Sequence, residues 1–182
     1  MRSELVADRR TIVVSGAPGT GKSTVASALA ERLQLPLLSL DDLKEALADV
    51  LGLGDELWSD RMGDAAAEVI FRLANTFPGV VAEGWWRRER RVRAIQEFQG
   101  WTEVFCSCDP DLAHQRATAR LHGRHPIHRD VINPSMLDGL AAAVGEVQPL
   151  QLGGALIEVD TTDAYDLDEL VARVRATTAP RA

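Results

Sequence analysis

The sequence is short of several features that define large classes of protein. No stretch approaches the uninterrupted apolar length of a membrane span, and residues 1–10 are charged, without the apolar centre of a secretion signal. Its two cysteines, Cys106 and Cys108, are too few and too close for a disulfide framework or a zinc site, so we expect both in the core. These absences predict a cytoplasmic protein without a membrane anchor or disulfide bonds.

Aromatic residues and positive charge are also scarce. Aromatic residues make up 5% of the chain and the formal net charge is -7, which disfavours nucleic acid as a partner because most of the surface repels phosphates. The apolar content of 46% and charged content of 26% are ordinary for a globular protein. A chain of 182 residues allows one α/β domain with a core, so we expect a single domain over 1–182. The oligomeric state is left open.

Strand-like and helix-like segments alternate along the chain. Short apolar runs, several rich in β-branched residues, predict five strands: 11–15, 37–40, 80–82, 102–108 and 155–159. Apolar residues at helical spacing predict five helices: 22–33, 43–51, 65–77, 110–120 and a last one from 166 onward. This alternation predicts an α/β fold with a parallel sheet that helices cover on both faces.

Start signals precede three of these helices, and Asp166 with Glu169 opens the last of them. Asp109 and Pro110 are typical of an N-cap and a first helical position. Asp42 and Glu45 have the spacing of a capping box, directly after the run 37–40, which we interpret as a buried strand.

A glycine-rich stretch between the first strand and the first helix carries the strongest functional signal. Residues 16–23 match the P-loop pattern G-x-x-x-x-G-K-[ST]. Glycines let backbone N–H groups turn onto phosphate oxygens, and the following helix points its positive end at the same anion. We expect Lys22 to reach the β- and γ-phosphates and Ser23 to hold Mg²⁺. ATP and Mg²⁺ are therefore the expected cofactors, bound by Gly16, Ala17, Pro18, Gly19, Thr20, Gly21, Lys22, Ser23 and Thr24.

Acidic and aromatic residues follow the second and third strands. Asp41 and Asp42 lie at the carboxyl edge of the predicted sheet, where ligands bind in open α/β folds, and Asp41 is our candidate base for an alcohol. The alternative is that both aspartates cap the next helix. Glu83 ends a buried run, where a carboxylate needs a partner such as Mg²⁺ or a substrate hydroxyl. Trp85 and Trp86 are candidates for an apolar wall of the acceptor site, or for the core.

Arginines occur near both ends of the expected site. Arg116 and Arg120 are four apart on one predicted helix, so they share a face and are candidates to clamp phosphates. They lead into 121–134, a stretch rich in Gly, His, Arg and Pro that suits a lid over ATP, or an ordinary surface loop. Arg87 and Arg88 are candidates to hold an anionic substrate, although a solvated basic face is the alternative.

Four stretches together resemble the AAA-type predicted kinases. They are 16–24, Leu-Ser-Leu-Asp-Asp-Leu at 38–43, Ala-Glu-Gly at 82–84, and Arg116-x-x-x-Arg120 with Gly-Arg-His-Pro-x-His-x-Asp at 123–130. That family spans essentially the whole chain, and it is similar to chloramphenicol phosphotransferase, gluconate and shikimate kinases, the zeta toxins and the kinase domain of polynucleotide kinases. Those relatives phosphorylate hydroxyls on the nucleoside-kinase-like P-loop NTPase fold. The resemblance implies a three-layer α/β sandwich with a five-stranded parallel sheet and a lid at about 121–134.

The resemblance also implies roles for single residues. In those relatives an aspartate after the second strand acts as base or binds the acceptor, which carries onto Asp41, and Lys44 matches a basic residue three positions further on. Their phosphate-contacting arginines near the lid carry onto Arg116 and Arg120. Many P-loop proteins have an aspartate on the third strand where this chain has Glu83, so its role toward metal or acceptor stays open.

These residues favour an ATP-dependent kinase that moves the γ-phosphoryl group of ATP to a hydroxyl of a small-molecule acceptor. Its expected catalytic residues are Lys22, Asp41, Arg116 and Arg120. The residues expected near the substrate are Asp41, Lys44, Glu83, Trp85, Trp86 and Arg87. A nucleotide kinase and a nucleotide-dependent switch or binding protein remain as alternatives. The sequence does not indicate which acceptor is used.

Overall fold

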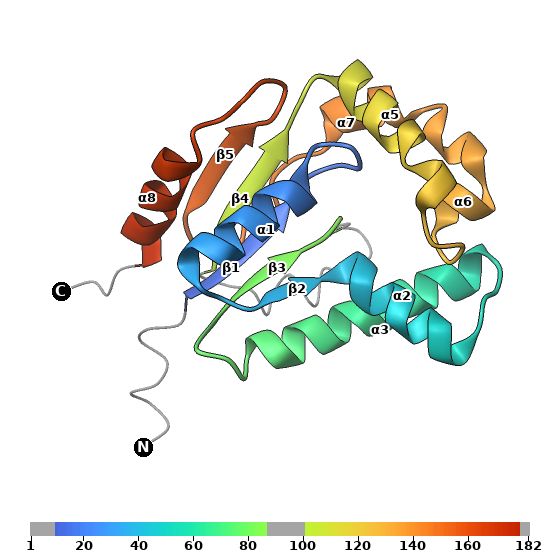
Figure 1. Ribbon diagram of the computed structural model, residues 1–182, viewed down its shortest axis with the longest axis horizontal. Helices are drawn as coiled ribbons and strands as arrows, with labels where there is room; N and C mark the ends of the chain where they lie inside the picture. Colours follow the sequence, from blue (N-terminus) through green and yellow to red (C-terminus); the bar gives the residue numbers. More distant parts are fainter. Residues whose placement is uncertain (1–9, 87–100, 179–182) are drawn as a thin grey trace.

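The fold is built on a parallel sheet of five strands in the order β2-β3-β1-β4-β5 (Figure 1). The computed structural model describes residues 10–86 and 101–178. The strands are β1 (Arg10–Ser15), β2 (Leu37–Ser39), β3 (Gly79–Glu83), β4 (Thr102–Ser107) and β5 (Leu156–Asp160). The predicted five-stranded parallel sheet is confirmed, because every strand lies where the apolar runs placed it, with small shifts at the ends.

Helices surround this sheet on three sides. They are α1 (Lys22–Leu33), α2 (Leu40–Leu51), α3 (Glu56–Ala74), α5 (Pro110–Ala119), α6 (Arg129–Ile132), α7 (Leu140–Glu146) and α8 (Leu167–Thr178), with 3₁₀ turns η2 (Leu121–Gly123) and η3 (Pro134–Leu137). Helices α1 and α8 lie on one face of the sheet and α3 on the other, whereas α5, α6 and α7 lie beyond the carboxyl ends of the strands (Figure 1). In the described residues no helix is long and apolar enough to cross a membrane.

Each side of the sheet has its own apolar core because side chains alternate along a strand. Ile12 and Val14 of β1 face α1 and α8, whereas Val13 between them faces α3. Cys106 belongs to the first of these cores and Cys108 to a smaller cluster under α5 and α7. Both cysteines are free and buried, which confirms the prediction that they are core residues.

The start of α2 differs from the sequence prediction. Ser39 is its N-cap, and the Ser39 hydroxyl accepts a hydrogen bond of 3.3 Å from the backbone N–H of Asp42. Asp42 therefore lies inside the first turn and is exposed, so its predicted capping role is wrong. The predicted burial of the second strand is also wrong, because β2 is an edge strand and Leu37 is 37% exposed.

Helix α3 begins nine residues before the predicted position. Asp55 caps it by accepting a 2.9 Å hydrogen bond from the backbone N–H of Trp58. The buried positions of its first two turns are Ser59, Met62 and Gly63, and the one apolar side chain among them gives no periodicity to detect. Those turns form part of the site described below, and no element was predicted for them.

Glu103 of β4 is a buried carboxylate that the sequence reasoning did not single out. It is 2% exposed and accepts hydrogen bonds from the hydroxyl of Ser15 at 2.6 Å and from the backbone N–H groups of Leu150 and Gln151 at 2.8 and 3.2 Å. A buried carboxylate is tolerated when its oxygens are satisfied in this way. Glu103 thus fixes the segment before β5 against the sheet.

The strand order determines where a ligand site can form. The chain leaves central β1 toward β2 and β3 on one side, and later toward β4 and β5 on the other. Ligands of open α/β sheets bind at such a switch point, outside the carboxyl ends of the strands. Four parts of the chain end or follow a strand at this edge: the loop at 16–21, Asp41, Glu83 and Thr161.

Candidate active site

The loop between β1 and α1 is shaped to receive an anion. Gly16 and Gly19 have positive φ angles of 140° and 83°, and a Cβ would lie 2.3 Å from the Cys106 carbonyl oxygen and 2.1 Å from that of Ala113, respectively. Only glycine allows this close approach. No side chain caps the N-terminus of α1, so its first backbone N–H groups are left for a phosphate.

Lys22 and Glu83 place opposite charges beside this loop. Lys22 is 9% exposed, and its ammonium donates a 3.0 Å hydrogen bond to the carbonyl oxygen of Ala17. Burial lowers the pKa of Lys22, an effect that the nearby carboxylates of Glu83 and Asp41 oppose. Burial also raises the pKa of Glu83 above its ordinary value, against the pull of Lys22. The two groups form a buried polar centre at the base of the site.

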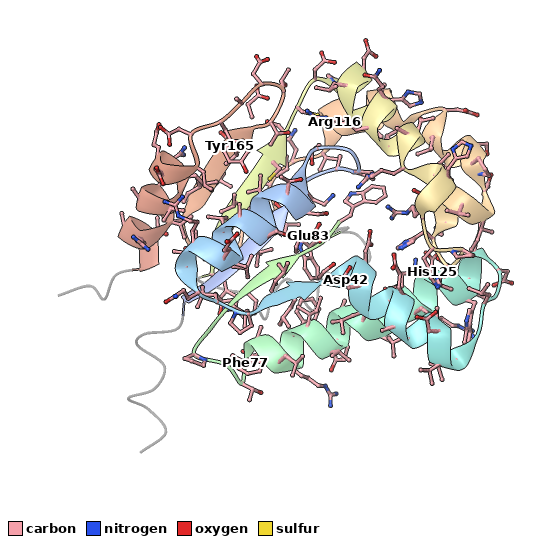
Figure 2. All side chains as sticks on the ribbon, viewed as in Figure 1. Asp42, Phe77, Glu83, Arg116, His125 and Tyr165 are labelled. Atoms are coloured by element: carbon pink, nitrogen blue, oxygen red, sulfur yellow. The ribbon has the colours of Figure 1, made fainter. Side chains whose placement is uncertain are left out.

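Ser23 and Glu83 have the chemistry of a magnesium site. The Ser23 hydroxyl donates a 3.3 Å hydrogen bond to Oε1 of Glu83, which lies at the carboxyl end of β3 in the middle of the molecule (Figure 2). Hydroxyl and carboxylate oxygens are ligands that Mg²⁺ accepts directly or through its water shell. These residues therefore fit the metal that ATP brings to a P-loop.

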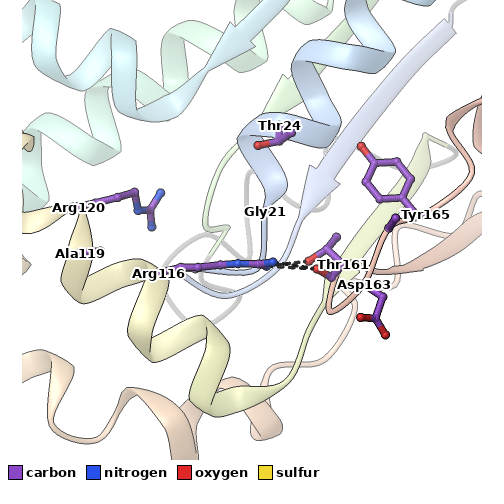
Figure 3. Close-up of a pocket in the computed structure, with 10 residues that line it drawn as sticks. Gly21, Thr24, Arg116, Ala119, Arg120, Thr161, Asp163 and Tyr165 are labelled. Atoms are coloured by element: carbon purple, nitrogen blue, oxygen red, sulfur yellow. Dashed lines mark hydrogen bonds between the residues drawn. The ribbon is translucent and has the colours of Figure 1, made fainter.

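A cavity of about 680 Å³ opens on one side of the loop (Figure 3). It is lined by Gly19, Gly21, Thr24, Arg116, Ala119, Arg120, Thr161, Asp163, Ala164 and Tyr165. Both terminal nitrogens of Arg116 donate 3.2 Å hydrogen bonds to the carbonyl oxygen of Thr161. The guanidinium of Arg120 makes no hydrogen bond or ion pair with any described residue and points from α5 toward the loop. The volume suits a nucleotide.

A second cavity, of about 140 Å³, lies on the other side of the loop, between α2, α3 and the chain after α5. Its polar lining consists of Asp41, Lys44, Ser59, Asp60, Arg124, His128, Arg129 and Asp130, and its apolar lining includes Pro18, Leu40, Trp85, Met136, Leu137 and Leu140. Pro18 belongs to the P-loop itself. Both cavities therefore border the P-loop.

An acidic face of α2 holds the chain after α5 in place. Residues four apart in a helix share one face, and here three such carboxylates each bind a basic side chain. The pairs are Asp41 with Arg124 at 3.0 Å, Glu45 with His128 at 2.7 Å, and Asp49 with His125 at 3.2 Å. His125 lies where this segment meets α2 (Figure 2). We call residues 121–134 the cover segment.

Asp41 stays ionised because of its neighbours. Removal from water would raise the pKa of its carboxyl, but Arg124, His128, Lys22 and Lys44 together hold that pKa below its ordinary value. Its Oδ1 makes no hydrogen bond to a described residue, whereas Oδ2 accepts from Arg124. Lys44 is buried beside it and donates a 2.7 Å hydrogen bond to the hydroxyl of Ser59.

Most of the residues singled out from the sequence come together at these cavities. The P-loop, Arg116 and Arg120 surround the larger one, and Asp41, Lys44 and Trp85 line the smaller one. Trp86 lies elsewhere: it is 3% exposed in the core, and its ring packs against Phe71 with centroids 5.8 Å apart. Arg87 and Arg88 lie outside the described residues.

Six polar residues of the smaller cavity were not among the predicted site residues, although three of them are named positions of the motif at 123–130 that carries the family resemblance: Ser59, Asp60, Arg124, His128, Arg129 and Asp130. Two of them lie on the early turns of α3, and four lie in the cover segment. The i, i+4 spacing of the acidic residues on α2 was a signal that something basic packs against that helix.

Comparison with known proteins agrees with this geometry. The family model of the AAA domain matches residues 12–135, and the chain belongs to this family of P-loop kinases. A shikimate kinase from Symbiobacterium thermophilum is 30% identical over 169 residues, which cover 90% of this chain and 92% of that one. An adenylate kinase from Mycobacterium ulcerans is 29% identical over 177 residues, covering 89% and 95%.

A solved structure is closer in sequence and similar in shape. It is a protein from Chloroflexus aurantiacus assigned as a kinase, with 32% identity, a TM-score of 0.83, and coverage of 93% of this chain and 98% of that one. The fold is that of an α/β P-loop NTPase, and the protein is an ATP-dependent kinase.

Proposed function

We propose that this kinase transfers the γ-phosphoryl group of ATP to a hydroxyl of a small molecule bound in the smaller cavity. The observation that carries the proposal is the ionised carboxylate of Asp41 on the wall of that cavity, near enough to Lys22 for their charges to interact. An alcohol must lose its proton as it attacks, whereas a phosphate acceptor is already an anion and needs no base. Asp41 supplies that base.

The other residues of the site bind the phosphates of ATP or offset their negative charge. Lys22 and the N–H groups at the start of α1 hold the phosphates, and Arg120 is directed at the same region. Ser23 and Glu83 would hold Mg²⁺, which when bound offsets negative charge on the phosphates. Arg116, which donates to the carbonyl oxygen of Thr161, also lines the larger cavity, one helical turn before Arg120.

A nucleotide kinase is the second candidate, favoured by the similarity to the adenylate kinase from Mycobacterium ulcerans. Such an enzyme must hold an acceptor phosphate with arginines. The described arginines of the smaller cavity are Arg124 and Arg129, and both are already paired with carboxylates. This pairing supports the hydroxyl kinase over the nucleotide kinase.

The proposal is tested by incubating the protein with Mg²⁺, ATP and pooled sugars, polyols, amino alcohols, nucleosides and nucleoside monophosphates. Transfer adds about 80 Da to the acceptor, which mass spectrometry detects. We expect the gain on a hydroxyl compound. A gain on nucleoside monophosphates alone, or ADP release with every acceptor unchanged, would contradict the proposal.

We also propose that the cover segment acts as a lid. Its contacts with α2 and α3 are side-chain pairs, such as Arg124 with Asp41 and Arg129 with Asp60, and few are backbone bonds. Such contacts open at small cost, so we expect the amides of 121–134 to exchange hydrogen faster without nucleotide than with a non-hydrolysable ATP analogue. The amides of β1 serve as the control. Equal protection of 121–134 in both states would rule out closure.

A further inference from the structure

Resting on the proposed function, we infer that the acceptor is an uncharged polyhydroxylated molecule of about monosaccharide size, and not a carboxylate or a phosphate. The relatives named above do not decide this point, because shikimate carries a carboxylate and nucleotides carry phosphates. The charge pairing inside the smaller cavity favours an uncharged acceptor.

Both described guanidinium groups in this cavity are committed to protein carboxylates. Arg124 pairs with Asp41 at 3.0 Å and with Asp130 at 3.1 Å. Arg129 pairs with Asp60 at 3.1 Å and also with Glu56. An acceptor carboxylate would have to displace one of these pairs and leave a protein carboxylate desolvated without its partner, which is costly.

Lys44 does not provide a spare anion site either. Its ammonium is buried, donates to Ser59, and feels the negative charges of Asp41, Asp60 and Asp130. The described lining holds three carboxylates, Asp41, Asp60 and Asp130, against the three cations Lys44, Arg124 and Arg129. Burial lowers the pKa of His128, which favours its neutral form. Among the described lining residues, positive and negative side chains therefore balance before any acceptor enters.

The same groups suit hydroxyls. A carboxylate oxygen such as Oδ1 of Asp41 accepts a hydrogen bond from a hydroxyl, and the Lys44 ammonium has donors beyond the one it gives to Ser59. Trp85 and Leu140 add apolar surface for the C–H face of a ring. A volume of about 140 Å³ is well below the roughly 300–1,000 Å³ of sites for larger ligands, which disfavours nucleosides.

The test uses the full chain with Mg²⁺ and ATP and compares matched pairs of alditols and aldonates with four to six carbons, together with shikimate, glucosamine and AMP. We expect kcat/KM for the best alditol or sugar to exceed that of its aldonate by about tenfold or more, since one unpaired buried charge costs at least that much. Faster transfer to an aldonate, to shikimate or to glucosamine overturns the inference and leaves the proposed function standing. Transfer to AMP alone, or to none of these compounds, overturns both.

Changing the charge balance gives a second test. Asp60→Asn leaves Arg129 with Glu56 alone, so the ratio of kcat/KM for aldonate over alditol should rise on the order of tenfold. Asp64→Asn is the matched control, because Asp64 lies four residues further along α3, is exposed and does not line the cavity. An unchanged ratio in Asp60→Asn, in a variant whose melting temperature shows that it is folded, overturns the inference.

Discussion

Replacing Lys22 with alanine is expected to abolish phosphoryl transfer and to weaken ATP binding strongly, with a loss in turnover on the order of a thousandfold or more. The reason is geometric. Lys22 is buried at the start of α1, and its ammonium donates to the carbonyl oxygen of Ala17 in the preceding loop. Because this cation is already fixed in position, little free energy is needed to order it when a phosphate binds. Calorimetry with ATP and a coupled assay for ADP measure the two effects.

Lys44→Ala is the control for Lys22→Ala. Lys44 lines the smaller cavity and does not line the larger one, so its removal should leave ATP affinity nearly unchanged while impairing the acceptor step. Both variants should stay folded, because each removes an ammonium whose pKa burial has lowered. Unchanged ATP affinity and persistent turnover in Lys22→Ala would show that the loop does not bind the nucleotide.

Asp41→Asn is expected to lower phosphoryl transfer by roughly a hundred- to ten-thousandfold while ATP affinity hardly changes. Asparagine keeps the size of the side chain and much of its hydrogen bonding, but it cannot take the proton of the acceptor. The loss falls toward the lower end if the proton leaves late in a loose transition state, which the low pKa of Asp41 favours. Steady-state rates with an identified acceptor, alongside calorimetry with ATP, measure it.

Asp42→Asn is the neighbouring control. Asp42 is exposed and is not the N-cap, so this variant should keep both its activity and its melting temperature. The cap is tested separately by Ser39→Ala, which should cost about 1 kcal/mol of stability. Full activity in Asp41→Asn would refute its assignment as the base, and an inactive Asp42→Asn would move that role one residue along the chain.

The parts of this fold that could be predicted are those where local sequence and tertiary structure agree. The strands β1, β3 and β4 are buried, so their apolar runs are continuous and easy to recognise. The loop at 16–21 needs glycine where the chain approaches the backbone of Cys106 and Ala113. The P-loop pattern contains glycines, so the loop could be recognised from the sequence.

The parts that could not be predicted depend on contacts between distant residues. Asp42 has a good residue type for a cap, and only the turn geometry shows that Ser39 takes that place. The start of α3 buries Ser59 and Gly63, which line the smaller cavity, and only Met62 as an apolar side chain, so its apolar period is too weak to recognise. The pairs of α2 with the cover segment join residues roughly eighty positions apart, beyond the reach of local reasoning.

Transfer to a hydroxyl group is tested most directly by the chemical identity of the product. Phosphorus NMR of a reaction with Mg²⁺, ATP and the best uncharged polyol follows the γ-phosphoryl group to its destination. We expect the γ-phosphate signal of ATP to be replaced by that of a phosphate monoester coupled to a carbon-bound proton of the acceptor. The appearance of inorganic phosphate alone, or of a new phosphoanhydride on a nucleotide acceptor, would contradict it.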